Sequence, residues 1–239
     1  MSTYKLEARP EGKELPRPSV AVDVVILTVT DGALFVCLYE RSDHPAKETY
    51  ALPGGFMRID ESLDDAARRI VREKAGLDDV FLEQLYTFGD PGRDPRGRVI
   101  TVAHVALIEA ARFHTSKAPK GRIDVPWPGE TGGPVDVTVN DDEAAADLAF
   151  DHGDILGLAV KRLRGKLDYT PIGFQLLPAE FTLRALQDVH EAVRGEQVNK
   201  DSFRRRMLAS GHIEATGSHE RGVTWRPAEL YRFVRRSAV

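Results

Sequence analysis

The sequence predicts an α/β sandwich built on a mixed sheet, followed by a small domain of helices and a two-stranded ribbon. Residues 20–29 form a nearly continuous apolar run, which is typical of a buried strand. A Pro-Gly-Gly turn at 53–55 leads into an amphipathic helix that ends before Gly76. From residue 181 the pattern changes to two short amphipathic helices and a hairpin. These patterns predict a sheet with helices on its faces, followed by a compact helical domain.

The first domain is completed by elements with strand or helix periodicity: strands at 34–39, 81–88 and 99–107, and a basic amphipathic helix at 154–167. The segment 113–140 is rich in Pro, Gly and Lys, which predicts a mobile surface insertion with one short strand at 135–139. We therefore divide the chain into a tail at 1–17, an α/β domain at 18–168, a packed linker at 169–180 and a second domain at 181–239.

Composition sets the broad class of the protein. The chain of 239 residues and 26.5 kDa is 42% hydrophobic and 29% charged, which suits one or two globular domains. Its net charge is −4, yet residues 171–239 hold more Lys and Arg than Asp and Glu. The single cysteine, Cys37, excludes an intrachain disulfide, and its place in an apolar strand predicts a buried thiol. The sequence has no signal-peptide or membrane-span pattern, so we expect a cytoplasmic protein.

The turn and helix at 52–77 carry a recognisable spacing. Glycines at 54 and 55 let the backbone approach a ligand closely, because they have no side chain in the way. The stretch resembles the Nudix box of the Nudix hydrolases, and the matching positions are Gly55, Glu61, Arg69, Val71, Glu73, Gly76 and Leu77. Two positions depart from that pattern, because Ile70 and Lys74 stand where the box has glutamates. The resemblance implies a Nudix α/β/α sandwich for the first domain.

The two departures bear on catalysis. Residues 70, 73 and 74 have the spacing of one helix face, and in an active box three carboxylates there would hold Mg²⁺. Here the same positions carry Ile70, Glu73 and Lys74, whose formal charges sum to zero. We therefore predict no catalytic residues, no metal ligands and no cofactor. Ile70 also belongs to the apolar stripe that is expected to face the core.

The second domain has the layout of a winged helix-turn-helix. Thr182 is expected to cap a helix that runs to 193, and Asn199 to cap a second helix at 200–209. Phe203, Met207 and Leu208 are expected to face inward. The ribbon is predicted from three consecutive segments: a strand at 211–217, a tip at 218–222 and a return strand at 223–225. Pro227 suits the first turn of a last helix, which would pack through Leu230, Tyr231 and Phe233.

A basic face on the second helix predicts DNA binding, because arginine binds phosphates and guanine edges with two hydrogen bonds. The predicted DNA contacts are Asn199, Lys200, Ser202, Arg204, Arg205, Thr216, His219 and Arg221. Arg206 is also expected to be exposed, although three consecutive arginines cannot share one helix face. The alternatives are a merely solvated basic face, or a scaffold that uses this domain for protein contacts without binding DNA.

A Nudix-like domain with an altered box, followed by a basic winged helix, resembles the Nudix-related transcriptional regulators called NrtR. Three segments carry this resemblance: the loop 93–97, the helix 199–208 and the stretch 226–233. The resemblance implies a homodimer that binds a pseudo-palindromic DNA operator, senses ADP-ribose or a similar nucleotide, and represses genes of NAD or sugar metabolism.

A pocket that once bound a nucleoside diphosphate can bind without cutting. The expected effector contacts are Gly54, Gly55, Arg41, Arg58, Glu61, Glu73, Lys74, Arg93 and Arg96. Lys74 replaces a metal's charge in this hypothesis, or alternatively it pairs with Glu73 or Glu61. The other hypothesis is an active Mg²⁺-dependent hydrolase of ADP-ribose or a related nucleoside diphosphate, completed by Glu40 or Glu143.

Overall fold

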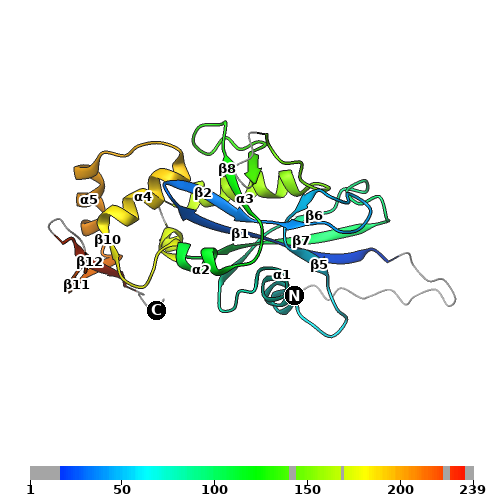
Figure 1. Ribbon diagram of the computed structural model, residues 1–239, viewed down its shortest axis with the longest axis horizontal. Helices are drawn as coiled ribbons and strands as arrows, with labels where there is room; N and C mark the ends of the chain where they lie inside the picture. The colour runs from blue at the N-terminus through cyan, green and yellow to red at the C-terminus, as the bar shows by residue number, and fades with distance from the viewer. Residues whose placement is uncertain (1–16, 140–143, 168–169, 223–226, 235–239) are drawn as a thin grey trace, which may run out of the picture.

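The computed structural model describes residues 17–139, 144–167, 170–222 and 227–234. Figure 1 shows an α/β domain with a smaller domain at one end of it. The α/β domain contains β1 (Ser19–Thr30), β2 (Ala33–Cys37), β3 (Tyr39–Glu40), β4 (Tyr50–Ala51), β5 (Gly54–Phe56), α1 (Leu63–Ala75), β6 (Phe81–Phe88), β7 (Val99–Leu107), α2 (Ala110–Thr115), β8 (Lys120–Asp124), β9 (Asp136–Val139) and α3 (His152–Lys166). The 3₁₀ helix η1 (Pro171–Leu176) leads to β10 (Phe181–Thr182), α4 (Leu183–Arg194), α5 (Lys200–Ala209), β11 (Ile213–His219) and β12 (Glu229–Phe233).

The main sheet has seven strands in the order β6-β7-β1-β2-β8-β9, and β5 also pairs with β1. β1 runs parallel to β7 and antiparallel to β2 and β5, so the sheet is mixed as predicted. Figure 1 shows α1 and α2 on one side of the sheet and α3 on the other. β1 is buried along almost its whole length because both faces of the sheet are covered. The buried thiol of Cys37 lies in β2.

The helix α1 forms for the reasons that the sequence suggests. The hydroxyl of Ser62 accepts a hydrogen bond from the Asp65 N–H at 3.1 Å, which caps the first turn. Gly76 ends the helix at φ +68°, a left-handed conformation that favours glycine. The apolar stripe packs under the sheet, and Ile70 is only 1% exposed. The helix therefore fixes the glycine turn and the loop before it against the core.

The segment 113–140 was predicted to be a mobile surface insertion, and its described part is instead built into the fold. It supplies β8 and β9 at one edge of the main sheet. Trp127 and Val135, from the connection between these strands, join the core. The Pro and Gly residues are concentrated in that connection, whereas the strands alternate buried and exposed side chains. Composition averaged over the whole segment concealed this alternation.

The second domain packs α4 and α5 against a three-stranded sheet in the order β10-β12-β11. Both predicted caps are present, because Thr182 accepts a hydrogen bond from Ala185 N–H and Asn199 accepts one from Ser202 N–H, each at 3.0 Å. Phe203 is buried in this small core and Met207 packs against it. The fold is therefore an α/β sandwich followed by a winged helix, as the sequence predicted.

The structure contradicts two predictions about the second domain, and a third falls outside the described residues. The expected last helix is wrong, because residues 229–233 form β12, which pairs with both β10 and β11. Tyr231 is buried in β12, and its aromatic neighbours favour a strand that completes the core. Leu208 was expected inside, yet it is 44% exposed. The expected return strand at 223–225 lies outside the described residues, as do nearly all of the tail and Glu143.

In the part of the chain that the structure describes, no helix has the length and apolarity to span a membrane.

Candidate functional site

A cavity of about 200 Å³ lies beside the glycine turn. It opens between β1, β5, the arginine-rich loop at 89–98 and the start of α3. Five of the predicted effector contacts line it: Gly54, Gly55, Arg41, Arg93 and Arg96. The other four, which are Arg58, Glu61, Glu73 and Lys74, do not line it. The remaining walls include residues that the sequence did not single out as site residues: Asp23, Tyr39, Phe56, Asp94, Phe150 and His152.

Gly54 allows β5 to lie directly against Asp23 of β1. A Cβ atom at residue 54 would stand 2.0 Å from the Asp23 Oδ1 atom and 3.3 Å from the Val22 carbonyl oxygen. Only glycine fits there, because a backbone atom and a buried carboxylate cannot both move away. Gly55 has more space, since its nearest neighbour would be Ile70 at 3.8 Å.

Gly54→Ala is expected to reduce both effector affinity and folding stability, because the added methyl group displaces the Asp23 carboxylate. We expect a loss of about 1–3 kcal/mol in the free energy of unfolding. Urea denaturation measures this loss, with Gly55→Ala as the matched control that adds the same methyl group where there is space. Equal stability of the two variants would contradict the close approach.

The floor of the cavity is a buried group of charged side chains. The guanidinium of Arg93 donates two hydrogen bonds to Asp151, at 2.8 and 2.6 Å, and lies 3.5 Å from the Asp23 carboxylate. The Arg93 side chain is only 5% exposed. Arg93 therefore joins the arginine-rich loop to the residue before α3 through two hydrogen bonds within the protein. This role differs from the predicted one, in which Arg93 serves the effector first.

His152 forms a second connection at the same place. The Leu52 N–H donates a hydrogen bond of 2.9 Å to the His152 Nδ1 atom, and His152 Nε2 lies 3.7 Å from the Asp23 Oδ1 atom. Burial lowers the pKa of His152, so the imidazole is neutral at pH 7, with its proton on Nε2. The sequence contained a signal for this group, because Asp23 is the one charged residue in the apolar run at 20–29.

The mouth of the cavity combines arginines with aromatic rings. The Arg41 guanidinium lies 4.8 Å from the centre of the Phe150 ring, and that of Arg96 lies 5.6 Å from the same ring. Arg96 also lies 5.5 Å from the centre of the Phe56 ring and forms an ion pair of 2.7 Å with Asp94. This pairing holds the pKa of Asp94 below its ordinary value. Backbone N–H groups, arginines and flat aromatic faces together suit an anionic ligand that carries an aromatic base.

The two glutamates that match the spacing of the box, Glu61 and Glu73, form an ion-pair network outside the cavity. Arg69 donates hydrogen bonds to Glu61 at 2.5 and 2.8 Å and to Glu73 at 3.2 Å. Arg58 completes the network, because its N–H donates to Glu61 at 2.8 Å and its guanidinium lies 3.3 Å from Glu73. These contacts fasten the loop before α1 to the side of that helix. Glu61, Glu73 and Arg58 therefore have a structural role here.

Residues 70, 73 and 74 do not meet at one ligand site. Ile70 is buried against the sheet, whereas Glu73 and Lys74 are exposed. The Lys74 ammonium lies 4.2 Å from the centre of the Tyr39 ring, so it stacks on an aromatic ring instead of pairing with Glu73 or Glu61. Spacing alone predicted their convergence, which is wrong, whereas the burial of Ile70 confirms its predicted place in the apolar stripe that faces the core.

This arrangement does not fit the Mg²⁺ site of a Nudix hydrolase. A magnesium ion requires oxygen ligands, and here the Glu61 and Glu73 carboxylates are occupied by arginines. Ile70 offers no oxygen, and Lys74 carries a positive charge at a position where the box has a glutamate. Glu40 is exposed at the end of β3 and has no described contact with this network.

The Glu61–Arg69 pair predicts a specific pH dependence. Hydrogen bonds from Arg69 and from the Arg58 backbone lower the pKa of Glu61 to about 2. Because the folded pKa lies below the unfolded value, the pair stabilises the protein above pH about 4.5 and loses this effect as the pH falls toward about 2. We expect the difference in unfolding free energy between wild type and Glu61→Gln to shrink over that interval. A difference that stays constant from pH 7 to pH 3 would contradict this assignment.

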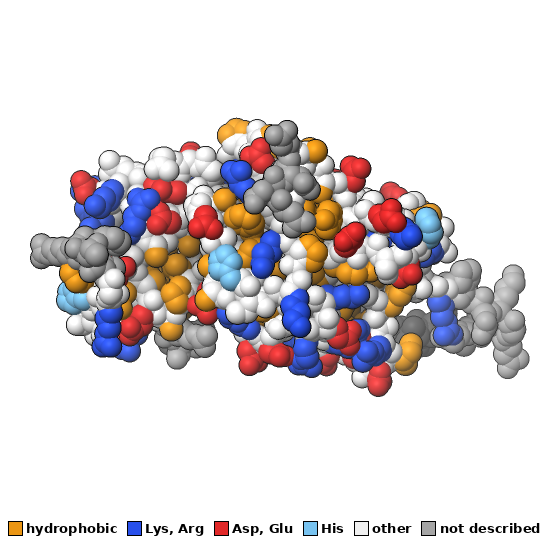
Figure 2. All heavy atoms as spheres, in the orientation of Figure 1, with side chains coloured by type: hydrophobic (Ala, Val, Ile, Leu, Met, Phe, Trp, Pro, Cys, Tyr) orange, Lys and Arg blue, Asp and Glu red, His pale blue; other side chains and the backbone are white. Residues whose placement is uncertain are grey.

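The predicted DNA-contacting residues lie on α5 and the ribbon. Lys200, Ser202, Arg204 and Arg205 are exposed on α5. Lys200, Arg204 and His219 line a groove of about 710 Å³ between α4, α5 and β12. Figure 2 shows Lys and Arg side chains at this end of the molecule. A helix with exposed arginines beside a ribbon has the shape and charge to enter a DNA groove.

Three other predicted contacts have different surroundings. Asn199 uses its side-chain oxygen to cap α5, and Thr216 donates its hydroxyl hydrogen bond to the Leu230 carbonyl at 3.0 Å. Both residues therefore hold the backbone of the reading elements in place. Arg221 is exposed just after β11. Arg206, on another side of α5, lies 5.6 Å from the centre of the Phe203 ring.

Comparison with known proteins agrees with this two-domain arrangement. Residues 17–128 match the model of the NUDIX domain, and residues 173–233 match that of the NrtR DNA-binding winged helix domain. The chain is 39% identical over 229 residues to the ADPR responsive transcriptional repressor NtrR of Acinetobacter baylyi, covering 95% of this chain and 86% of that protein.

Two solved structures have the same fold over nearly the whole chain. The Shewanella oneidensis NrtR in complex with a 27mer DNA superimposes with a TM-score of 0.73 at 33% identity, covering 90% of this chain and 93% of that one. A MutT/nudix family protein from Enterococcus faecalis gives a TM-score of 0.75 at 27% identity, covering 94% of this chain and 90% of that one. The chain belongs to the NrtR family of transcriptional regulators, in which a Nudix domain precedes a DNA-binding winged helix domain.

Proposed function

We propose that this protein is a transcriptional repressor that binds DNA as a homodimer and is controlled by ADP-ribose. The observation that carries this proposal is the pairing, in one chain, of a glycine- and arginine-lined cavity with a winged helix that presents exposed arginines. The Acinetobacter baylyi relative is described as responsive to ADPR, and the Shewanella oneidensis relative is described in complex with DNA. The genes of NAD metabolism or of sugar metabolism are the proposed targets.

The cavity suits ADP-ribose through three kinds of contact. Gly54 and Gly55 line the cavity and have no side chains that would keep a diphosphate away from the backbone. Arg41 and Arg96 bring positive charge to the mouth, where the diphosphate would lie. The aromatic rings of Phe56 and Phe150 line the cavity and suit contact with an adenine ring.

Hydrolysis of ADP-ribose is the alternative function, and the geometry of the box disfavours it. The altered box leaves no described set of carboxylates free to hold magnesium, so bound ADP-ribose would be sensed rather than cleaved. Incubation of the protein with ADP-ribose and Mg²⁺ measures this directly. Catalytic release of AMP and ribose phosphate would contradict a purely regulatory role.

DNA affinity with and without effector tests the main proposal. A duplex enriched from a random-sequence library by the ligand-free protein serves as the probe, and fluorescence anisotropy measures its dissociation constant at fixed salt. We expect ADP-ribose to weaken DNA binding by about tenfold or more, within the usual range of coupling between two sites. AMP, which lacks the diphosphate, is the matched control. Unchanged affinity would exclude ADP-ribose as the effector, and DNA binding that does not weaken as salt rises would favour a protein scaffold.

A further inference from the structure

The helix α4 belongs to both domains. Its residues Val189 and Val193 pack into the core of the α/β domain, together with β1, β2 and α3. Its residues Leu183 and Leu186 pack into the small core of the winged helix. A movement of α4 relative to the α/β domain must therefore move the winged helix with it, because close-packed cores transmit displacement instead of absorbing it.

The helix α3 connects the effector cavity to α4. Its first turn follows Phe150 and Asp151, and His152 begins it, so three consecutive residues contact the cavity or its floor. Its last turn reaches α4 through Arg164. The helix is buried along one side, where Ile155, Leu156 and six further residues are buried. Because α3 is a rigid helix, a change in the position of its first turn also changes the position of its last turn.

Arg164 holds three segments together at the far end of α3. Its Nε–H donates to the Val193 carbonyl of α4 at 2.7 Å, and its Nη1 donates to the carbonyls of Trp127 and Gly129 at 2.8 and 3.1 Å. The guanidinium also lies 4.6 Å from the centre of the Trp127 ring, and the residue is 6% exposed. Gly195 completes the fit, because a Cβ there would stand 3.1 Å from the Arg164 Nη2 atom.

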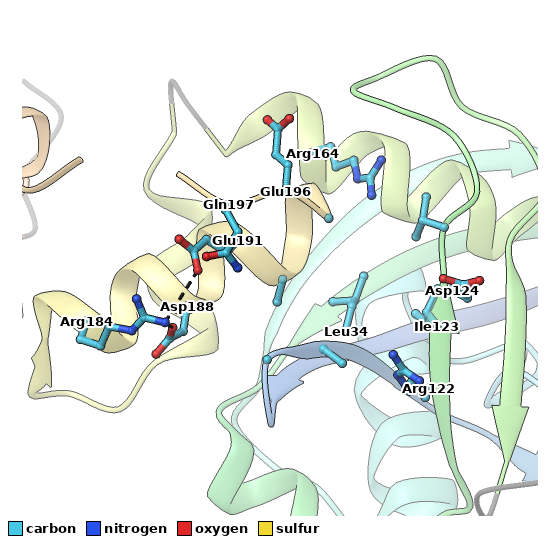
Figure 3. A pocket seen from close by; sticks show the side chains of 15 residues that line it. Leu34, Arg122, Ile123, Asp124, Arg164, Arg184, Asp188, Glu191, Glu196 and Gln197 are labelled. Carbon is cyan, nitrogen blue, oxygen red and sulfur yellow. Dashed lines mark ion pairs between the residues drawn. The ribbon is translucent and has the colours of Figure 1, made fainter. Parts of the chain in front are cut away.

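A cleft separates the two domains on the side of Arg164. It has a volume of about 420 Å³ and is lined by the β1–β2 turn, β8, the end of α3 and α4. In Figure 3 the side chains of Arg184, Asp188 and Glu191 come from α4, across the cleft from Leu34 and Arg122. Arg184 pairs with Asp188 at 2.6 Å, within α4 itself. The cleft leaves α4 space to shift, and Arg164 bridges the domains beside it.

We infer that α3 is the coupling element of this regulator and that Arg164 is its coupling residue, which transmits effector binding to α4. This inference rests on the proposed function and assigns the route by which its two sites communicate. Effector contact at Phe150 displaces the start of α3, and Arg164 passes that displacement to the end of α4. From there, His190 of α4 contacts Phe203 of α5, with ring centres 4.9 Å apart, so the DNA-reading helix follows.

The turn between α4 and α5 is stiff enough to transmit this movement. The Glu191 carboxylate accepts hydrogen bonds from the Gln187 amide at 2.8 Å and from the Val198 N–H at 3.1 Å. Gln187 also donates to the Val198 carbonyl at 3.2 Å. These bonds close the turn onto α4, so that α4 and α5 move as one unit.

Arg164→Lys in the full-length protein tests the inference. Lysine keeps the charge but cannot bridge the Val193 and Trp127 carbonyls in the same way, because it lacks the planar fork of arginine. Three quantities are measured: the ADP-ribose dissociation constant, the dissociation constant of the library-selected duplex, and the latter at saturating ADP-ribose. We expect the first two to change by less than about threefold, while the effect of ADP-ribose on DNA binding falls at least about fivefold.

Arg162→Lys is the matched control on the same helix. Arg162 donates to the Leu85 carbonyl within the α/β domain at 3.4 Å, so its replacement should leave the coupling unchanged. Equal coupling in Arg164→Lys and wild type would overturn the inference while leaving the proposed function intact. A wild-type protein whose DNA affinity ignores ADP-ribose would overturn both.

Hydrogen exchange of the wild-type protein provides a test that needs no variant. Addition of ADP-ribose is expected to change the protection of amides at 190–198 and 125–131, the segments that Arg164 joins. A change confined to the walls of the effector cavity would overturn the inference, even if Arg164→Lys failed to fold.

Discussion

Arg93→Met is expected to destabilise the α/β domain by about 3–5 kcal/mol, because it leaves the carboxylates of Asp23 and Asp151 without a cation in a buried place. The loss exceeds that of a surface ion pair, since the Arg93 side chain is 5% exposed and little water can replace the guanidinium. Chemical denaturation of the two proteins at pH 7 measures the difference. Effector affinity should fall as well, because the floor of the cavity loses the bridge between the arginine-rich loop and α3.

Arg98→Met separates this effect from the general loss of a loop arginine. Arg98 lies in the same loop, is exposed, and donates one hydrogen bond to the Gly89 carbonyl at 2.8 Å. Its replacement should cost less than about 1 kcal/mol. If Arg93→Met were no more destabilising than Arg98→Met, Arg93 would not be the cation that holds the cavity floor together.

Local chemistry made much of the fold predictable. Capping residues and stop glycines placed α1, α4 and α5, because these signals lie within a few residues of the helix ends that they determine. The failed helix at the C-terminus had only Pro227 and spacing to support it. Whether Tyr231 packs as part of a strand or of a helix depends on β10 and β11, and pairing between distant segments is not written in the local pattern.

The residues that line the cavity proposed for the effector also differ in how far local sequence could predict them. Turn chemistry and charge within short segments singled out Gly54, Gly55 and the loop arginines, which line one cavity, and their contact with an effector stays a prediction. Asp23, Phe150 and His152 were missed because they lie far apart in the sequence and meet only after β1 and α3 have packed. Of these three residues, Asp23 could most readily have been predicted from the sequence, since a charged residue within a buried strand requires a partner. Phe150, at φ +56°, gave no signal in the sequence.

The box illustrates why spacing is an insufficient guide to chemistry. Glu61 and Glu73 occupy matching positions, yet their carboxylates bind Arg69 and Arg58. Ile70 shows the opposite case, where a position expected at a ligand site has become part of the core. Ile70→Glu should therefore unfold the domain before it restores a metal site, because it places a carboxylate at a position that is 1% exposed. Ile70→Glu alone would therefore not show whether the protein is a sensor or a hydrolase.

The second large effect is expected on DNA binding. Replacement of both Arg204 and Arg205 by Ala should weaken binding of the library-selected duplex by about a hundredfold, because each arginine contact with DNA contributes about 1–3 kcal/mol. In a homodimer each substitution acts twice, which increases the loss. Both side chains are exposed on α5, so folding should change little. Fluorescence anisotropy over a range of salt concentrations measures the affinity and its salt dependence.

The salt dependence distinguishes phosphate contacts from base contacts. Each lost phosphate contact should lower the slope of log affinity against log salt by about one, whereas a lost base contact lowers affinity without changing that slope. Arg204 lines the groove between α4, α5 and β12 with Lys200 and His219, whereas Arg205 does not, so the slope is also measured for each single variant. Arg68→Ala, which removes one positive charge from the exposed face of α1 as each single variant does from α5, should leave DNA affinity within about twofold of wild type. An equal loss in Arg68→Ala would mean that the overall charge, and not the face of α5, governs DNA binding.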